Sequence, residues 1–559
     1  MRVCEASRPA TACRNDLDRT VPVNAPTAPK TRYFDLPPVR TDSQPAFVDL
    51  VGVRRWLEEL KDLPAASANG MLYTQLALFT NFQIGTDTRY SVLEALRPAL
   101  FQIQAEHTES FRGKPLPLSP QRREVLSEVT SLWDALSRGY QRCLEQWTGR
   151  DPGMPDAIAG ACARALDAVA RKMREQHFAY VQIPSPDYKL LHRLYLFAER
   201  HGIARRKVKD PLATVGDPIT CLRVYARALL LDAAMPREHR FDRLVIIENW
   251  VERWSAKVTI HQEPPEEPEA APLFINLARG LGASREPELG SHVRYVDVSA
   301  LDQSIAKRIH MLRHGKKPDE LELGSQLTQR EAEHLLVAVH RQWCDGPPRR
   351  VHERNPMDQL AHASPGLIAA HFYVAKQPFA QPFNPPMPVE SGEERVRLAT
   401  SYLKEHGIRA EQWIIRDESL TGLGLVRPLG ESDDSRLIHG QLITVRRRGG
   451  GGVWIGTIQW LQEAIEGDLL IGARLVPGIP VAVAARRIGE EPFFPALMLD
   501  PIPAMNAPTS LLLPAGTYAP QRVIEIFRRG VDRIQLTGVL ESGGDYERVA
   551  FMPILGSSA

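Results

Sequence analysis

The chain has 559 residues, of which 43% are hydrophobic, so it can supply the cores of several domains. Its formal net charge of +2 argues against a globally basic protein that coats nucleic acid. The six cysteines lie far apart with no CxxC pair, which argues against a zinc knuckle and indicates reduced cytoplasmic thiols. The sequence lacks an apolar signal-peptide core and any run of about 18 apolar residues, so we expect a cytoplasmic protein without a membrane span.

The first 45 residues are rich in proline and polar residues and show no sustained periodicity. Such a composition cannot bury enough apolar surface to fold alone. We predict a mobile or surface-wrapped tail over residues 1–45.

Residues 46–343 show helical patterning and are predicted to form a large all-α region. Ser119 and Pro120 provide a cap and a first turn for a long helix, and Thr328 with Glu331 makes a capping box for the last one. Apolar residues recur every three or four positions along the first of these helices, at Leu126, Val129, Trp133, Leu136, Tyr140 and Cys143. No fixed repeat period is present, so a regular solenoid is not expected.

From about residue 345 the chain changes to short runs of Val, Ile and Leu separated by Gly and Pro. These runs predict a small antiparallel barrel over 345–490, with a helical insertion near 392–407, and an additional small β module over 496–559. The run "GLIAAHFYV" (366–374) is interpreted as one of the strands. The predicted fold class is therefore α+β multidomain, with an all-α region before the β-barrel.

The stretch "WIIRDESLTGLGLV" (413–426) places Asp417, Ser419 and Gly422 inside an apolar hairpin. The pattern D-x-S-x-x-G between strands, with an upstream R-x-x-x-R at Arg350 and Arg354, resembles the PilZ domain. That family is a bacterial β-barrel receptor for cyclic di-GMP. The resemblance covers residues 349–485, about a quarter of the chain, and the segment from about 496 is similar to an extra β segment of longer PilZ proteins.

The resemblance implies a receptor for cyclic di-GMP that needs no cofactor and no catalysis. Its expected ligand-binding residues are Arg350, Arg354, Asp417, Ser419 and Gly422. Guanidinium groups can fork onto phosphate or onto the guanine O6 and N7 atoms. A carboxylate and a hydroxyl can accept the guanine N1 and N2 donors, and a glycine permits a positive φ or a close backbone approach.

The distance along the chain between the two motifs leaves an alternative open. The family normally places its arginine pair some twenty to thirty residues before the Asp/Ser/Gly motif, whereas here a helical insertion lies between Arg354 and Asp417. The insertion could loop out and leave the site intact. Otherwise Arg395, Arg397 or Arg409 would supply the cation, or the pocket would be degenerate.

Other patterns favour structural interpretations. The "RRRGGGG" run, Arg446 to Gly452, is typical of a hairpin tip with solvated arginines. Trp454 and Trp460 are expected to share one face and to belong to the barrel core. The histidines include no HExxH pattern, so no metal site is predicted, and no combination of nucleophile, base and orienting residue supports an enzyme.

The leading hypothesis is a non-catalytic cyclic di-GMP receptor whose helical region relays ligand binding to a protein partner. The alternative is a ligand-free scaffold or chaperone-like adaptor with a degenerate PilZ-like barrel, whose helices hold a client. A third hypothesis makes the C-terminal barrels bind single-stranded nucleic acid through Arg446 to Arg448 and the tryptophans.

Overall fold

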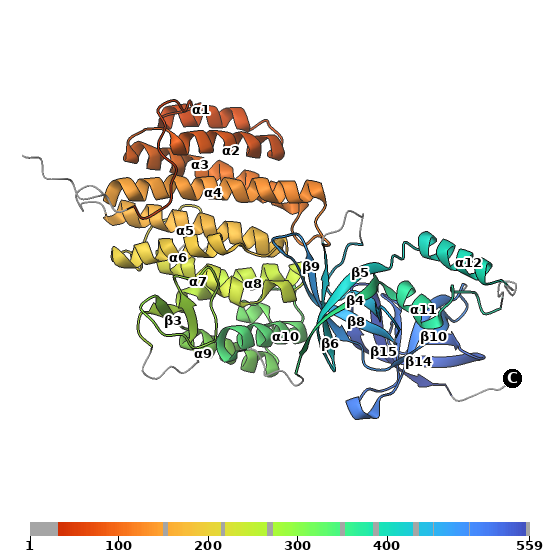
Figure 1. The fold of residues 1–559 in the computed structure, drawn as a ribbon. Coiled ribbons are helices and arrows are strands. Elements are labelled where there is room, and N and C mark those ends of the chain that lie inside the picture. Colours follow the sequence, from red (N-terminus) through yellow and green to blue (C-terminus); the bar gives the residue numbers. More distant parts are fainter. Residues whose placement is uncertain are drawn as a thin grey trace, which may run out of the picture.

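The computed structural model describes residues 32–148, 155–213, 218–264, 272–346, 353–383, 391–428, 435–450, 452–490 and 492–554. These residues form a stack of helices followed by two antiparallel β-barrels, with the second barrel farthest from α1 (Figure 1). The predicted fold class, an N-terminal helical region followed by C-terminal antiparallel β-barrels, is confirmed.

The helices of the N-terminal region stack in chain order, from red to green in Figure 1. They are α1 (Leu50–Leu60), α2 (Ala65–Asn81), α3 (Thr86–His107), α4 (Pro120–Thr148), α5 (Pro155–Phe178), α6 (Ser185–Arg200), α7 (Cys221–Ala233), α8 (Phe241–Trp254), α9 (Ser299–Arg313) and α10 (Gln329–His340). The local signals hold. Helix α4 begins at Pro120 with the Ser119 hydroxyl accepting from the Arg122 amide, and Thr328 and Glu331 form the predicted capping box of α10.

The described part of the N-terminal tail wraps along these helices. Phe34 is buried against the helical core, and its backbone N–H donates to Glu145 at 3.0 Å. The Arg142 guanidinium donates to the carbonyl of Pro37. Residues 1–31 of the predicted tail lie outside the described residues.

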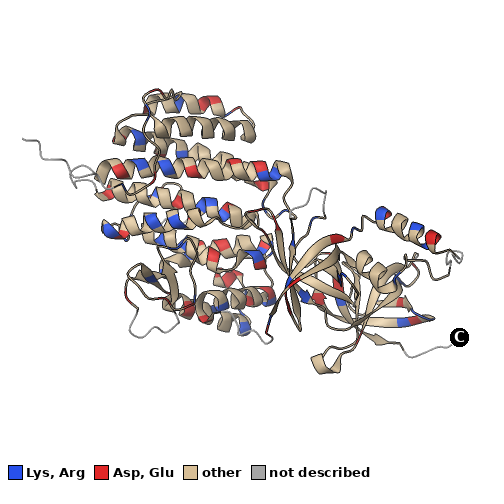
Figure 2. Cartoon of the chain, in the orientation of Figure 1, with Lys and Arg blue, Asp and Glu red and all other residues tan. Residues whose placement is uncertain are grey.

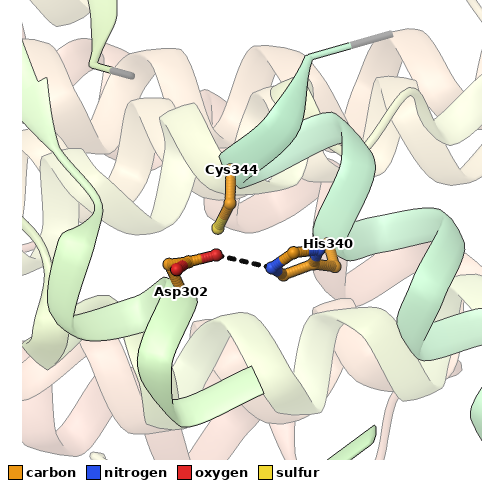
Figure 3. A group of neighbouring side chains, drawn as sticks. All are labelled: Asp302, His340 and Cys344. Carbon is orange, nitrogen blue, oxygen red and sulfur yellow. Dashed lines mark hydrogen bonds and ion pairs between the residues drawn. The ribbon is translucent and has the colours of Figure 1, made fainter. Parts of the chain in front are cut away.

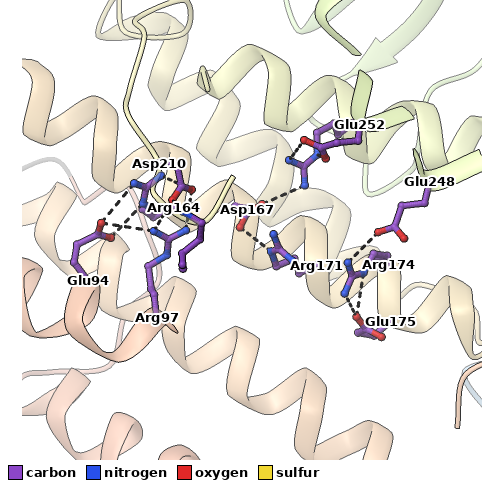
Figure 4. A network of polar contacts seen from close by, with 12 residues as sticks. Glu94, Arg97, Arg164, Asp167, Arg171, Arg174, Glu175, Asp210, Glu248 and Glu252 are labelled. Carbon is purple, nitrogen blue, oxygen red and sulfur yellow. Dashed lines mark hydrogen bonds and ion pairs between the residues drawn. The ribbon is translucent and has the colours of Figure 1, made fainter. Parts of the chain in front are cut away.

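Ion pairs cross-link the helices around α5, as Figure 4 shows. Asp167 of α5 accepts from Arg171 at 2.8 Å and lies 3.3 Å from Arg227 of α7. Burial alone would raise the pKa of Asp167, but the two guanidiniums outweigh it and hold the pKa below its usual range. The remaining members are Glu94, Arg97, Arg164, Arg174, Glu175, Asp210, Glu248 and Glu252. Because breaking one buried pair leaves the other charge uncompensated, the network opposes sliding of these helices.

The expectation of an all-α region over 46–343 is wrong in one place. A three-stranded antiparallel sheet lies between α8 and α9, in the order β1-β3-β2. Its strands are β1 (Thr259–His261), β2 (Leu273–Asn276) and β3 (Val293–Asp297). Strands of three to five residues are too short to produce a clear alternation in the sequence.

The first barrel is closed, with strand order β4-β5-β6-β9-β8-β7. Its strands are β4 (Asn355–Pro365), β5 (Glu411–Ser419), β6 (Gly422–Arg427), β7 (Leu442–Arg447), β8 (Val453–Glu463) and β9 (Leu469–Leu475). Inward residues such as Trp413, Ile415, Leu425 and Ile471 join the same core as the helices. The first barrel and the helical region therefore share one continuous hydrophobic core.

Two helices interrupt this barrel between β4 and β5. Helix α12 (Gly392–Glu405) corresponds to the predicted insertion and projects from the barrel (Figure 1). Helix α11 (Leu367–Ala375) occupies the segment interpreted as a strand, so that prediction is wrong. Gly366, with φ of +95°, ends β4 and lets the chain turn directly into α11, where Ala369 and Ala370 are buried.

The second barrel repeats the strand order of the first, as β10-β11-β12-β15-β14-β13. Its strands are β10 (Ile479–Arg487), β11 (Phe494–Asp500), β12 (Ser510–Pro514), β13 (Val523–Phe527), β14 (Val531–Ser542) and β15 (Tyr546–Pro553). The strand at 479–487, which the predicted boundaries place in the first barrel, pairs only with β11 and β13. The second barrel thus begins at Ile479 instead of 496.

The first barrel is fixed to the helical region by backbone pairing. Val181 pairs with Glu463 at the end of β8, and Leu116 pairs with Leu437. The buried Glu463 carboxylate also accepts from the Leu118 amide at 3.2 Å and from Arg123 at 2.7 Å. These contacts hold the end of β8 against the helical region.

Candidate functional site

Arg354 and Asp417 form an ion pair although 63 residues separate them in the chain. Strands β4 and β5 are antiparallel, with Pro356 paired with Asp417 and Ala363 paired with Glu411. The insertion that carries α11 and α12 leaves from the Ala363 end of this pair. It loops out and leaves Arg354, just before β4, beside Asp417.

The Asp/Ser/Gly motif faces outward from the barrel. Leu423 of β6 points into the core, so its neighbours Gly422 and Gly424 point out. Ser419 pairs with Gly422 and Asp417 pairs with Gly424. A β-bulge between Ile415 and Asp417 shifts the alternation of β5, which directs Asp417 to the outer face.

Gly424 is a residue of this face that the sequence motif did not indicate. A Cβ atom at Gly424 would lie 2.5 Å from Asp417 Oδ2, so only glycine lets the carboxylate lie across β6. Gly422 lies in a strand and does not need a positive φ, contrary to one of the two roles predicted for it. The other role holds, because a Cβ atom there would lie 3.1 Å from the carbonyl of Ala473. Ser419 Oγ donates to the carbonyl of Gly422 at 3.3 Å.

Strand β9 adds a cation to the same face. Arg474 pairs with Gly422, so its side chain points outward beside the Ser419 turn. Its guanidinium donates to Glu541 of the second barrel at 2.6 Å. The run "LLIGARLV" contains this arginine, but only the register of β6 against β9 places it at the motif.

The remaining predicted arginines have different outcomes. Arg350 lies outside the described residues. The alternative cations Arg395 and Arg397 are on α12, and Arg409 follows it, with its carbonyl accepting from Ser364 Oγ at the far end of β4. The six residues of β5 between that end and Asp417 span about 20 Å. The structure therefore brings Arg354, and not these three, to the motif.

The arginines of the "RRRGGGG" run are not all solvated. Arg447 points into the mouth of the first barrel, where it donates to Glu418 at 2.5 Å and lies 4.2 Å from the ring centroid of Trp454. Arg446 lies over the ring of Tyr373. Only Arg448 of the three is exposed, so the interpretation of this run as a hairpin tip with solvated arginines is wrong for the first two.

Trp454 and Trp460 were expected to share one face of β8, but they do not. A bulge between Ile458 and Trp460 reverses the alternation. Trp454 packs against the barrel core, whereas Trp460 lies on the outside against Arg237 of the helical region. The core interpretation thus fits Trp454 alone.

Asp302, His340 and Cys344 form a group whose ligand atoms lie within 4.8 Å of one another (Figure 3). His340 Nε2 lies 2.6 Å from Asp302, and its Nδ1 lies 3.1 Å from Asp345. Burial and the nearby Asp302 raise the pKa of the Cys344 thiol to about 12. Both imidazole nitrogens are thus engaged by carboxylates and the thiol stays protonated, which fits a hydrogen-bonded junction between α9 and the turn of π-helix at Arg341–Asp345.

Charges of both signs are interspersed over the helices, as Figure 2 shows. No single-sign belt that would follow a nucleic-acid backbone is visible on the described residues in this view. No helix among the described residues is both long and apolar enough to cross a bilayer.

Comparison with known proteins gives matches at both ends of the chain. Residues 51–266 match the family described as the N-terminal domain of the cyclic-di-GMP receptor FimW, and residues 481–554 match the FimW C-terminal beta-barrel domain. The chain is similar to FimW. The curated cyclic-di-GMP receptor FimW of Pseudomonas aeruginosa is 22% identical over 365 residues. That alignment covers 65% of this chain and 59% of FimW, so the chain matches less than two thirds of its relative.

The two FimW domain families do not include the face described above. Their matched ranges leave residues 267–480 between them, and these residues contain the first barrel with Asp417 and Ser419. The similarity to FimW and the geometry of the first barrel are therefore separate observations.

Proposed function

We propose that the chain is a non-catalytic receptor for cyclic di-GMP, and that the first barrel is PilZ-like and binds the ligand on the outer face of β5, β6 and β9. The observation that carries the proposal is the meeting of Arg354 with Asp417 beside Ser419 and Gly422, across 63 residues of chain. The similarity to a cyclic-di-GMP receptor at both ends of the chain supports it independently.

Asp417 and Arg354 are paired with each other at the proposed site. Asp417 has its carboxylate engaged by Arg354, and both side chains are about 30% exposed, at 32% and 29%. A guanine could replace the guanidinium at Asp417 by offering its N1 and N2 donors. Arg354 would then be released to fork onto phosphate or the guanine O6 and N7 edge.

In this proposal the helical region relays binding to a protein partner. The backbone pairs at Val181 and Leu116 join the helices to the first barrel, and the ion pairs around α5 make the helices respond together. A ligand that shifts Arg354 at the start of β4 would alter the junction between helices and barrel.

Calorimetric titration with cyclic di-GMP tests the proposal. Wild-type protein should bind, and Asp417→Ala or Ser419→Ala should weaken binding more than tenfold, because each leaves guanine donors unpaired. Arg350→Ala and Arg354→Ala should each cost about ten- to a hundredfold. Arg354→Lys should resemble Arg354→Ala if the contact is to a base, because lysine lacks the planar fork.

Arg529→Ala is a suitable control, since Arg529 is exposed on the β13–β14 hairpin of the second barrel. It should bind like wild type. Absence of both heat and a thermal shift with tens of micromolar ligand would contradict the proposal and favour the ligand-free scaffold or adaptor. In that case the barrel would be a degenerate relative and the helices would carry the function.

A further inference from the structure

Strand register extends the outer face of the first barrel from Asp417 to a tryptophan. Asp417 pairs with Gly424, Gly424 pairs with Gly472 of β9, and Gly472 pairs with Trp460 of β8. Residues paired directly across strands share a face. One row on the outside of the barrel therefore begins with a carboxylate, crosses two glycines and ends with an indole.

The two glycines bring the ends of this row together. A Cβ atom at Gly424 would lie 2.5 Å from Asp417 Oδ2, and one at Gly472 would lie 2.0 Å from Trp460 Nε1. The carboxylate thus lies over β6 and the indole over β9. These strands are neighbours, about 4.8 Å apart. Asp417 and Trp460 are consequently adjacent on the barrel surface although their own strands are not.

Trp460 is covered by a cation from the helical region. The guanidinium carbon of Arg237 lies 5.1 Å from the centroid of the Trp460 ring. The backbone at Arg237 is fixed, because its carbonyl accepts from Nε2 of the buried His439 at 2.7 Å. Arg237 also lines a pocket of about 310 Å³ between the helices and the β8–β9 hairpin, together with Gln462 and Ile465.

The guanidinium of Arg237 has no hydrogen bond or ion pair to any residue that the structure describes, and its Nε is buried without a partner. A buried N–H without an acceptor costs free energy, and an acceptor that a ligand supplies would recover it. The cation–π contact holds the guanidinium over the indole and leaves its N–H groups unused. This arrangement is suited to an anionic, planar ligand.

We propose that Trp460 and Arg237 form the second half of the cyclic di-GMP site, so that the bound dinucleotide bridges the first barrel and the helical region. The inference rests on the proposed function. One guanine is held at Asp417 and Ser419, and the neighbouring phosphate or second guanine takes the N–H groups of Arg237 above Trp460. Ligand binding then pulls on Arg237, in the 3-10 turn Pro236–Glu238 that follows α7, which gives the helical region a direct contact with the signal.

Calorimetry on the full chain with cyclic di-GMP tests this inference. Trp460→Ala and Arg237→Ala should each weaken binding about ten- to a hundredfold, the range of one charged contact, because the ligand loses either the guanidinium or the ring that supports it. Trp460→Phe should remain within about threefold of wild type, because phenylalanine keeps an aromatic face. Arg237→Lys should resemble Arg237→Ala, because lysine lacks the planar group.

The double variant Trp460→Ala/Arg237→Ala should bind about as weakly as either single variant, since the indole orients the guanidinium. Arg240→Ala is the matched control: it follows in the same segment, its side chain is 65% exposed, and it should bind like wild type. Thermal unfolding without ligand establishes that each variant is folded.

The outcomes separate the two proposals. If wild type binds and Asp417→Ala does not, while Trp460→Ala and Arg237→Ala stay within twofold of wild type, this inference is overturned and the proposed function stands. If Trp460→Ala and Arg237→Ala both weaken binding as expected and Trp460→Phe binds within about threefold of wild type, the inference is supported. If wild type shows no binding, the proposed function itself fails and this inference falls with it.

Discussion

The two barrels have the same strand order, but the equivalent outer face is polar in the first barrel and apolar in the second. In the first barrel, Asp417 pairs with Gly424 across β5 and β6. In the second, the matching strands β11 and β12 pair Leu497 with Leu512. Both pairs point outward, because the flanking residues of β6 and β12 are in the two barrel cores. A carboxylate over a glycine in one barrel thus corresponds to two leucines in the other.

Because of this difference, the same outer face has a different role in each barrel. The outward leucines of the second barrel form a cluster with the outer side of the first barrel and with α11. Its members are Leu367, Ala370, Leu442, Ile455, Val476, Leu497, Leu499, Leu512 and Tyr546. The second barrel uses this face to pack against apolar residues, whereas the equivalent face of the first carries polar groups and glycines. Function therefore depends on the residues of the face and does not follow from the fold.

Leu512→Ala should cause the largest effect and should act on stability alone. Leu512 is fully buried between the barrels, and truncating such a leucine costs about 2–5 kcal/mol. Denaturant unfolding of the full chain measures the loss. Cyclic di-GMP affinity should change less than twofold, because the first barrel's face is unaltered. A large loss of affinity in folded protein would show that the second barrel shapes the site.

Gly424→Ala should cause the reverse, a loss of binding with little loss of stability. The added methyl would occupy the place of the Asp417 carboxylate, which must turn away. Displacing one charged contact costs roughly 2 kcal/mol, or about thirtyfold in affinity by calorimetry. Gly538→Ala in β14 is the matched control, since a Cβ atom there meets nothing within 4 Å. Normal affinity in Gly424→Ala would contradict the placement of the ligand on this face.

A third prediction concerns acid sensitivity. The second barrel pairs Arg486 with Glu525 where the first pairs Ser364 with Thr444. Hydrogen bonds from Arg486 and Arg533 outweigh burial and lower the pKa of Glu525. A lowered pKa adds stability that is complete above the unfolded-state pKa, near 4.3, and is lost as the pH falls through the folded-state value.

Glu525→Gln should therefore cost about 1–3 kcal/mol of unfolding free energy at pH 7, because it removes the charge of a carboxylate that is only 7% exposed and is paired with Arg486 and Arg533. Its stability should then fall less steeply than that of wild type as the pH drops from 5 to 3. Denaturant unfolding across this range measures both slopes. Parallel slopes would show that Glu525 does not contribute to the acid sensitivity of the second barrel.

Local signals in the sequence predicted the elements well and their partners poorly. The capping box at Thr328 and the apolar runs of β7 and β8, with glycines between them, depend on neighbouring residues, so they are visible in the sequence. The segment of α11 is ambiguous, because its aromatic and branched residues also suit a strand and only burial on several sides favours a helix. The strands β1 to β3 are too short to show a repeating pattern of apolar and polar residues in the sequence.

The site itself could be predicted only in part. Asp417, Ser419 and Gly422 are close in sequence and form one turn, so the motif revealed them. The position of Arg354 beside Asp417 could be predicted only if the insertion was known to loop out. The antiparallel pairing of β4 and β5 shows that it does. Gly424, Gly472 and Trp460 lie at the proposed site because of the register of four strands and the position of two bulges. A shift of one residue in that register would turn each of them to the other face of the barrel. No local pattern contains that information.

The smallest expected effect concerns an ion pair between the first barrel and the second. Arg474 lies beside Gly422 on the proposed ligand face, and Glu541 of the second barrel accepts from it. Because the Arg474 side chain is 47% exposed, the pair contributes at most about 1 kcal/mol, yet it competes with any phosphate that approaches Arg474.

Glu541→Gln keeps an acceptor for Tyr546 and removes the competing charge. Affinity for cyclic di-GMP should rise about two- to fivefold at low salt and return to the wild-type value at high salt, where both interactions are screened. Weaker binding in this variant would mean that Glu541 orients Arg474 for the ligand, and the second barrel would then be part of the site.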